Sequence, residues 1–187
     1  MRSPFYFIAK PIEGRRYNNT KEIAGIQLIT STSEEDYKAS NRLAEVIELP
    51  LGYNGRIKPG DTLLVHHNVF KFYNDVRGKR RSGKSFFRDD YFFIEPDQFY
   101  LYKQDGKWNS HDRFCFVKPV PVVESYIFKP FKDEPLMGEM MYPSQYLLSK
   151  GVNAHDIVCF QPDSEYEFEV DGQLMYRIYD HQITVKL

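Results

Sequence analysis

The chain contains little cysteine and no long apolar run. Its two cysteines, Cys115 and Cys159, each lie in an apolar, strand-like stretch of the 187 residues. Two cysteines are too few for a disulfide framework, so we expect both to be reduced core residues, with a buried disulfide between them as the alternative. No apolar run approaches the ~20 residues that a membrane-spanning helix needs, and the first residues lack the apolar stretch of a signal peptide. We therefore predict a cytoplasmic protein.

Excess charge and catalytic motifs are also missing. Lys and Arg number 25 and Asp and Glu 26, for a net charge of -1, which gives the whole molecule no attraction to nucleic acid or to an anionic membrane. The five histidines are scattered without metal-ligand spacing. Adjacent histidines such as His66 and His67 would point to opposite faces if they lay on a strand, so a metal shared between them is not expected. No serine stands in a Gly-x-Ser-x-Gly turn. We predict no enzymatic activity, cofactor or metal, and expect neither nucleic acid nor a membrane as a partner.

What the sequence does contain is a repeat. Four blocks of the N-terminal part recur in the same order in the C-terminal part. Two copies of this size indicate duplication of one small domain, because a solenoid needs at least about three shorter units. We predict a first domain over 1–103, a linker over 104–112 and a second domain over 113–187. The matched blocks are 7–12 with 115–120, 43–47 with 137–141, 57–65 with 152–160, and 93–99 with 177–183.

Short strands dominate the expected secondary structure. Aromatic residues make up 16% of the chain and favour strands, and turn-forming residues bound each strand-like stretch. Short helical turns are expected at 96–98 and 144–150. The pattern predicts an all-β protein with two partly open barrels in tandem. The expected strands are 5–11, 43–49, 61–65, 69–73, 91–94, 99–102, 113–120, 138–142, 156–160, 166–170, 174–179 and 183–186.

An ordered set of blocks distinguishes the first repeat. A strand at 7–11 precedes a long polar loop, about 13–42, that contains Gly25-Ile26-Gln27-Leu28. Ala44-Glu45-Val46, the turn Ile57-Lys58-Pro59-Gly60-Asp61 and a hairpin ending at 93–99 follow. No block is diagnostic alone, but the ordered set resembles the GroES-type co-chaperonins over most of the first repeat. The resemblance implies two GroES-like barrels in tandem, although the second repeat matches the strands and not the long loop.

The resemblance also implies a docking function. In that family the loop is mobile until an apolar tripeptide docks into a groove on a GroEL-type chaperonin. The matching residues are Ile26, Gln27 and Leu28, flanked by Gly25 and Ile29, and the polar residues around them are too hydrophilic to bury. The family further implies a homo-oligomeric ring that caps the chaperonin, encloses an unfolded client and leaves ATP hydrolysis to its partner. The alternative for residues 26–29 is a short strand packed on its own barrel.

Two departures from the family pattern are visible. The family usually carries a roof hairpin where this chain has only residues 48–56, and phage-encoded co-chaperonins similarly lack the roof. In the second repeat, residues 121–136 replace the docking loop with the apolar stretch 122–128, which we expect to form an interface, with a second docking site as the alternative. A phage structural or assembly protein that uses the barrel for subunit contacts is the alternative function.

A rival motif lies in the first repeat. Residues 78–85 fit the GxxxxGK[ST] pattern of a phosphate-binding loop, but the following residues are strand-like, and such a loop must open a helix. The repeat comparison instead places the motif at the hairpin turn matched by Asp171-Gly172. We therefore expect a solvated basic tip, with an acidic client, a phosphate backbone or a neighbouring subunit as possible contacts. Its basic residues are Arg77, Lys79, Arg80, Arg81 and Lys84.

Overall fold

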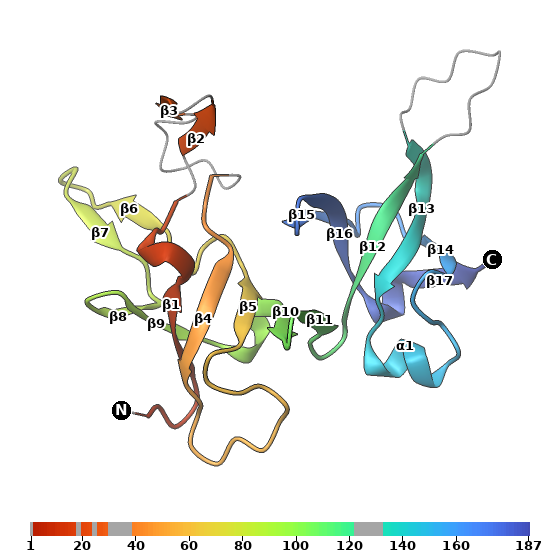
Figure 1. Ribbon diagram of the computed structural model, residues 1–187, viewed down its shortest axis with the longest axis horizontal. Helices are drawn as coiled ribbons and strands as arrows, with labels where there is room; N and C mark the ends of the chain where they lie inside the picture. The colour runs from red at the N-terminus through yellow and green to blue at the C-terminus, as the bar shows by residue number, and fades with distance from the viewer. Residues whose placement is uncertain (1, 18–19, 24–25, 30–38, 122–132) are drawn as a thin grey trace. The chain divides into compact units, whose positions relative to one another are not determined.

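The computed structural model describes residues 2–17, 20–23, 26–29, 39–121 and 133–187 (Figure 1). The chain divides into two compact units, Met1–Lys107 and Trp108–Leu187. Its sheets are antiparallel, and the described residues contain a single α-helix, α1 (Gln145–Ser149). The prediction of an all-β protein is therefore confirmed. No helix in the described part of the chain is long and apolar enough to span a membrane.

Unit 1 supplies six strands of a seven-stranded sheet in the order β11-β10-β5-β4-β1-β9-β8, and β11 begins at its last residue, Lys107. The strands at the two ends of this order do not pair with each other, so the sheet is not a closed barrel. One face of the sheet buries aromatic and aliphatic side chains, including Phe7, Phe70, Phe92 and Phe99. The strands are β1 (Phe7–Pro11), β4 (Leu43–Glu48), β5 (Thr62–Val65), β8 (Phe86–Arg88), β9 (Tyr91–Ile94), β10 (Phe99–Gln104) and β11 (Lys107–Ser110).

Unit 2 has a six-stranded sheet in the order β15-β16-β12-β13-β14-β17. This order repeats the order β8-β9-β1-β4-β5-β10 of unit 1, strand for strand. Its core contains Cys115, Val117, Met140 and Ile178. Cys115 and Cys159 are both free thiols, as expected, but only Cys115 is a buried core residue, whereas Cys159 is partly exposed. The strands are β12 (Phe114–Pro121), β13 (Asp133–Tyr142), β14 (Ile157–Phe160), β15 (Tyr166–Val170), β16 (Gln173–Tyr179) and β17 (Ile183–Lys186).

The strand registers repeat as well as the strand order. Lys10 lies opposite Glu45 in the β1–β4 pair, and Lys118 lies opposite Glu139 in the β12–β13 pair. Both pairs shift register at the same place, immediately before Ala9 in unit 1 and immediately before Val117 in unit 2, and the β12–β13 pair shifts again between Pro119 and Pro121. The residues that the sequence comparison aligned therefore occupy equivalent positions in the two sheets, down to the β-bulge.

The turn before the third strand is also duplicated. In unit 1 the carboxylate of Asp61 accepts a hydrogen bond from the backbone N–H of Lys58 at 2.8 Å. In unit 2 the carboxylate of Asp156 accepts one from the N–H of Asn153 at 2.6 Å. Aspartate is common in such turns because its short side chain can form a hydrogen bond with a backbone group a few residues away. The residue before each aspartate has a left-handed backbone, with φ of 92° in unit 1 and 70° in unit 2.

The short helical turns lie where the sequence predicted them. The 3-10 turn η2 (Pro96–Gln98) precedes β10, and η3 (Asp180–Gln182) occupies the same place before β17. Helix α1 begins after Ser144, whose hydroxyl accepts a hydrogen bond from the Leu147 N–H. Serine is a preferred residue at this position because it satisfies one of the unpaired N–H groups of the first turn.

Some elements differ from the sequence-based expectations. Residues 104–112, expected as a linker, include β11 and the turn of its hairpin with β10. Val69 and Phe70 are buried in a turn, and the strand expected over 69–73 is instead β6 (Phe72–Asn74). Strand β6 pairs with β7 (Arg80–Ser82) in a two-stranded sheet of its own. Unit 2 has no room for an equivalent hairpin, because residues 161–165 join β14 directly to β15.

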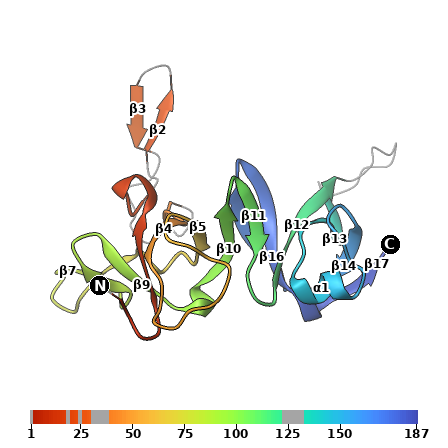
Figure 2. The ribbon, with the colours of Figure 1, turned by 60° about the horizontal axis from the view of Figure 1, so that its bottom comes forward.

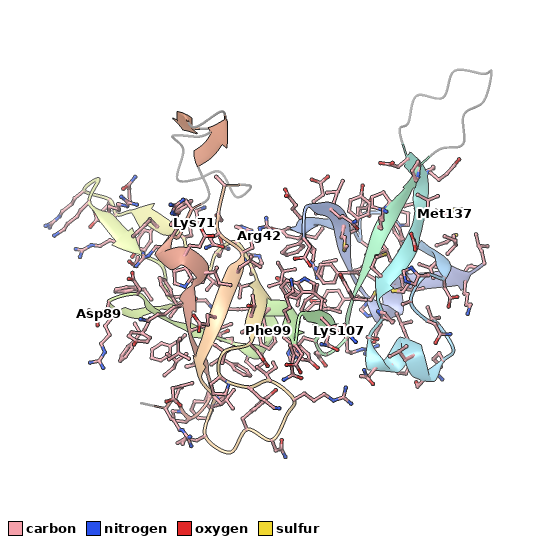
Figure 3. All side chains as sticks on the ribbon, in the orientation of Figure 1. Arg42, Lys71, Asp89, Phe99, Lys107 and Met137 are labelled. Carbon is pink, nitrogen blue, oxygen red and sulfur yellow. The ribbon has the colours of Figure 1, made fainter. Side chains whose placement is uncertain are left out.

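The placement of the GxxxxGK[ST] motif at the Asp171-Gly172 turn is therefore wrong. The β15–β16 turn at Asp171 corresponds to the β8–β9 turn at Asp89, and both aspartates have φ near 50°, at 47° and 49°. Residues 78–85 lie before that turn, in the inserted β6–β7 hairpin and the segment leading to β8. Figure 3 labels Lys71 at the start of the insertion and Asp89 in the separate β8–β9 turn. The sequence comparison lacked a counterpart for the insertion, so it matched the wrong turn.

A compensating exchange of side-chain size separates the two units. Ala9 and Ala44 in unit 1 correspond to Val117 and Gly138 in unit 2. A Cβ atom added to Gly138 would lie 2.9 Å from the Cβ atom of Val117, closer than two such atoms can approach. The larger side chain on β12 thus requires glycine on β13.

We predict that Gly138→Ala destabilises the protein by about 1–3 kcal/mol, because a methyl group is forced into a packed core. Adding Val117→Ala should recover part of this loss, because the pair then reproduces the two alanines of unit 1. Denaturant unfolding of the two single variants and the double variant measures the coupling. Strictly additive losses would show that the two side chains do not compete for the same space.

Candidate functional site

The predicted docking segment lies in a β-hairpin between β1 and β4. Strand β2 (Thr20–Ile23) pairs with β3 (Ile26–Ile29), with Ile23 opposite Ile26. Among the described strands β3 pairs only with β2, and the two form a separate two-stranded sheet (Figure 2). Gly25 lies outside the described residues, as do the side chains of Ile26, Gln27, Leu28 and Ile29. The backbone thus gives no pairing of this segment with the main sheet of unit 1.

The two ends of the loop are joined by the buried Asn41, which is 3% exposed. Its side-chain amide donates to the carbonyl oxygens of Ile12 at 3.0 Å and Arg15 at 2.7 Å, and its carbonyl oxygen accepts from the Leu43 N–H at 2.9 Å. The Asn41 N–H also donates to the Arg16 carbonyl. A single side chain therefore ties the outgoing chain to the returning chain.

Arg16 and Tyr17 attach the loop base to the inserted hairpin. The Arg16 guanidinium lies 4.1 Å from the ring centroid of Phe72 and donates to the Ser82 hydroxyl at 2.9 Å. The Tyr17 ring stacks on Phe72, with an interplanar angle of 16°, and its hydroxyl accepts from the Phe72 N–H at 2.9 Å. Tyr17 also forms a β-bridge with Ser40. The base of the loop and the base of the hairpin thus form one packed unit.

We call residues 71–84 the basic hairpin. All five residues of the predicted basic patch lie in it. Arg80 stacks on the Phe72 ring at 3.7 Å, Arg81 bonds Asp75 at 3.2 Å and Lys84 bonds Glu95 at 3.4 Å. Arg80 and Arg81 therefore stabilise the hairpin itself, and Lys84 links it to Glu95. The side chains of Arg77 and Lys79 are exposed.

Asp75 organises the turn of the basic hairpin. Its Oδ1 atom accepts from the backbone N–H groups of Arg77 and Lys79, both at 2.9 Å. The hydrogen bond from the Lys79 N–H, followed by those from Arg77 and Arg81, lowers the pKa of the Asp75 carboxyl below its ordinary value. Val76 at the tip is fully exposed, at 104%. The carboxylate of Asp75 thus holds the backbone of the turn, and the side chain of Val76 points outward from it.

The GxxxxGK[ST] motif does not have the geometry of a phosphate-binding loop. Such a loop runs from a strand into the N-terminus of a helix and leaves its N–H groups to the phosphates. Here the residues run from a turn through β7 into β8, and no helix follows. The Gly78 and Gly83 N–H groups already donate to the carbonyls of Asp75 and Lys71. The match lies in the spacing of residues and not in the arrangement of the backbone.

The adjacent histidines lie outside the strands, with their rings close together. Strand β5 ends at Val65, and His66 and His67 occupy the following turn with their ring centroids 4.1 Å apart. Burial, followed by the neighbouring His66, lowers the pKa of His67 to about 4. His67 is therefore neutral at physiological pH.

The corresponding loop of unit 2 leaves the sheet at the same place. Pro121 at the end of β12 lies opposite Asp133 at the start of β13. The apolar stretch 122–128, expected to be an interface, lies outside the described residues. Each unit thus inserts a segment between its first and second strands, and the longer segment belongs to unit 1.

No protein-family model and no curated protein matches this sequence. The features of the chain that bear on its function are the loop between β1 and β4 and the hairpin packed against the base of that loop.

We predict that Asn41→Ala lowers the free energy of unfolding by about 1–3 kcal/mol, because buried backbone groups lose their hydrogen-bond partners. Asn68→Ala is the matched control, since Asn68 is exposed. Thermal and denaturant unfolding of both variants test this, and equal stability of the two would contradict the bridging role of Asn41.

We also predict that the Asp75 carboxyl titrates below its ordinary value of 3.8. Because the folded-state pKa is depressed, the stabilisation of the turn is complete above the unfolded-state value and is lost as the pH falls through the folded-state value. A carbon-13 NMR titration of the Asp75 carboxyl measures the midpoint. A midpoint at or above 3.8 would show that the N–H groups of Arg77 and Lys79 do not hold the carboxylate.

Proposed function

We propose that this protein is a tandem GroES-like co-chaperonin that caps a GroEL-type chaperonin ring. The supporting observation is the place and pairing of the loop at 13–42. It is inserted between the first and second strands of unit 1, its base is fixed by Asn41, and its hairpin pairs within itself. A fixed base and a distal hairpin that pairs with no strand of the main sheet suit a segment that docks on a partner.

The connection between β4 and β5 fits a co-chaperonin without a roof hairpin. Tyr53 folds back onto the core, with its ring centroid 5.1 Å from that of Phe7. Its hydroxyl accepts a hydrogen bond from the Ile57 N–H at 3.4 Å. Leu49 and Tyr53 therefore pack this connection against the core of unit 1, and its shortness supports the resemblance to the phage-encoded co-chaperonins that lack the roof.

The proposed mechanism is docking without catalysis by this chain. Full burial of Ile26 and Leu28 in an apolar groove would contribute ~1.5–3 kcal/mol each. Ordering the loop costs ~1–2 kcal/mol per residue, so the β2–β3 pairing lowers this cost by fixing part of the backbone beforehand. One loop alone binds weakly, and a homo-oligomeric ring of loops supplies the affinity through effective concentration. ATP hydrolysis belongs to the chaperonin, and the client is enclosed without a dedicated site on this chain.

We predict that Leu28→Ala abolishes or strongly weakens ATP-dependent binding to a chaperonin, because a small loss per loop is multiplied around the ring. The thermal midpoint should stay near that of the unaltered protein. Co-migration with a purified GroEL-type chaperonin on a sizing column, with and without ATP, measures the binding. The chaperonin ATPase rate is an independent measure of the same complex.

Two leucine variants serve as controls. Leu51→Ala alters an exposed residue, 56% exposed, in the β4–β5 connection and should leave binding intact. Leu63→Ala alters a fully buried residue and should cost about 2–5 kcal/mol of stability. If Leu28→Ala behaves like Leu63→Ala, residues 26–29 belong to a core. If the unaltered protein does not associate with any chaperonin, the alternative of a phage structural or assembly subunit is favoured.

A further inference from the structure

The basic hairpin concentrates positive charge in a chain that is otherwise acidic. Residues 71–84 contain six Lys and Arg residues and one acid, Asp75, whereas the whole chain carries a net charge of -1. A cluster of one sign on a short ribbon attracts a surface of the opposite sign. This concentration is not explained by the docking loop, which carries the apolar residues.

The single acid of the hairpin is used internally. Asp75 accepts two backbone N–H groups of its own turn and a side-chain hydrogen bond from Arg81. It therefore neutralises Arg81 and shapes the turn, while Arg77 and Lys79 are held on the outside of that turn. The turn is fixed before any partner arrives, so binding does not have to order the backbone that carries these two cations.

The hairpin packs directly against the loop base. Arg16 contacts both strands of the hairpin, through the Phe72 ring of β6 and the Ser82 hydroxyl of β7. Tyr17 stacks on the same Phe72 ring. This leaves one face of the ribbon covered, while Tyr73, 53% exposed, marks the opposite face. The Tyr73 face and the turn are therefore the parts of the hairpin that stay open to a partner.

We propose that the basic hairpin binds acidic side chains on the chaperonin surface, beside the groove that receives the β2–β3 hairpin. This inference rests on the proposed function and specifies its partner: an apolar groove bordered by carboxylates. The loop provides apolar contacts that form late and hold the complex. The hairpin provides charges that act before contact, over a Debye length of about 10 Å at 0.1 M salt.

A protein surface fits the hairpin better than a nucleic acid does. The ribbon has only one open face, because Arg16 and Tyr17 occupy the other, so it cannot enter a groove with both faces in contact. The remainder of the chain is acidic and repels a long polyanion. A protein with a local acidic border meets neither obstacle.

The test is a charge reversal at the two exposed cations of the turn, Arg77→Glu with Lys79→Glu. The matched control is Arg56→Glu with Lys58→Glu, which changes the net charge equally on the connection that leaves β4 at the end opposite to the loop. Association with a purified GroEL-type chaperonin and ATP is followed by stopped-flow fluorescence. The measurement is repeated as the salt concentration rises from about 0.1 M to about 1 M, which shortens the Debye length to about 3 Å.

We expect the hairpin variant to associate at least about tenfold more slowly at low salt and to lose most of its salt dependence, because charges at the edge of an interface act mainly on the association rate. The control pair should stay close to the unaltered protein. The neutral pair Arg77→Gln with Lys79→Gln should fall between the two. Circular dichroism and the thermal midpoint should be the same for all variants, since both positions are exposed.

Three results would overturn the inference. Equal association rates for the hairpin and control variants would show that the charges do not face the chaperonin, while leaving the co-chaperonin function intact. Binding of a labelled oligonucleotide, single-stranded or duplex, that the hairpin variant alone loses, with chaperonin binding unchanged, would identify a nucleic-acid site instead. Failure of the unaltered protein to bind the chaperonin at all would remove the proposed function and this inference with it.

Discussion

The pairing of β1 with β4 is the contact on which both the core and the candidate site of unit 1 depend. These strands carry Ala9, Ala44 and Val46 into the core. The loop at 13–42 leaves the end of one strand and returns to the start of the other, so the same ladder fixes the spacing of its two ends. Asn41 then needs only three short hydrogen bonds to close the base. A loop of this length is tolerated because closure entropy grows slowly with loop length.

The inserted β6–β7 hairpin gives unit 1 something that unit 2 lacks. It adds a ring, Phe72, on which Arg16 and Tyr17 can stack, and its turn adds a cationic surface at the other end of the hairpin. Unit 2 keeps the sheet, the bulge, the aspartate turns and the 3-10 turn before the last strand. The duplication has thus preserved the scaffold in both copies while the elements proposed for partner contact are concentrated in one.

The features predicted from the sequence are those with local signals. The repeat blocks correctly predicted that Lys10 and Lys118 occupy equivalent positions. Both copies retain a Lys-Pro sequence, and each lysine lies opposite a glutamate on the neighbouring strand. Ser144 and the proline of η2 marked the helical turns through ordinary capping chemistry. The basic patch was recognised by composition alone.

The parts that the sequence did not predict depend on contacts between distant residues. Nothing next to Asn41 shows that its amide joins carbonyls at 12 and 15 across the loop. The stacking of Arg16 and Tyr17 on Phe72 joins positions more than fifty residues apart. Strands β6 and β7 are three residues each, too short for an alternating pattern to stand out. The insertion also displaced the repeat comparison from the Asp89 turn to the glycine-rich motif.

The size exchange between the Ala9–Ala44 and Val117–Gly138 pairs has a consequence for how the chain reaches its native state. Tandem copies of one sheet can misfold by exchanging equivalent strands, a characteristic error of repeat proteins. If β12 paired with β4, Val117 would be forced against Ala44, and if β1 paired with β13, Ala9 would face Gly138 and leave a void. Both exchanged sheets are packed worse than the native ones. The difference in side-chain size therefore favours the pairing of each first strand with the second strand of its own copy.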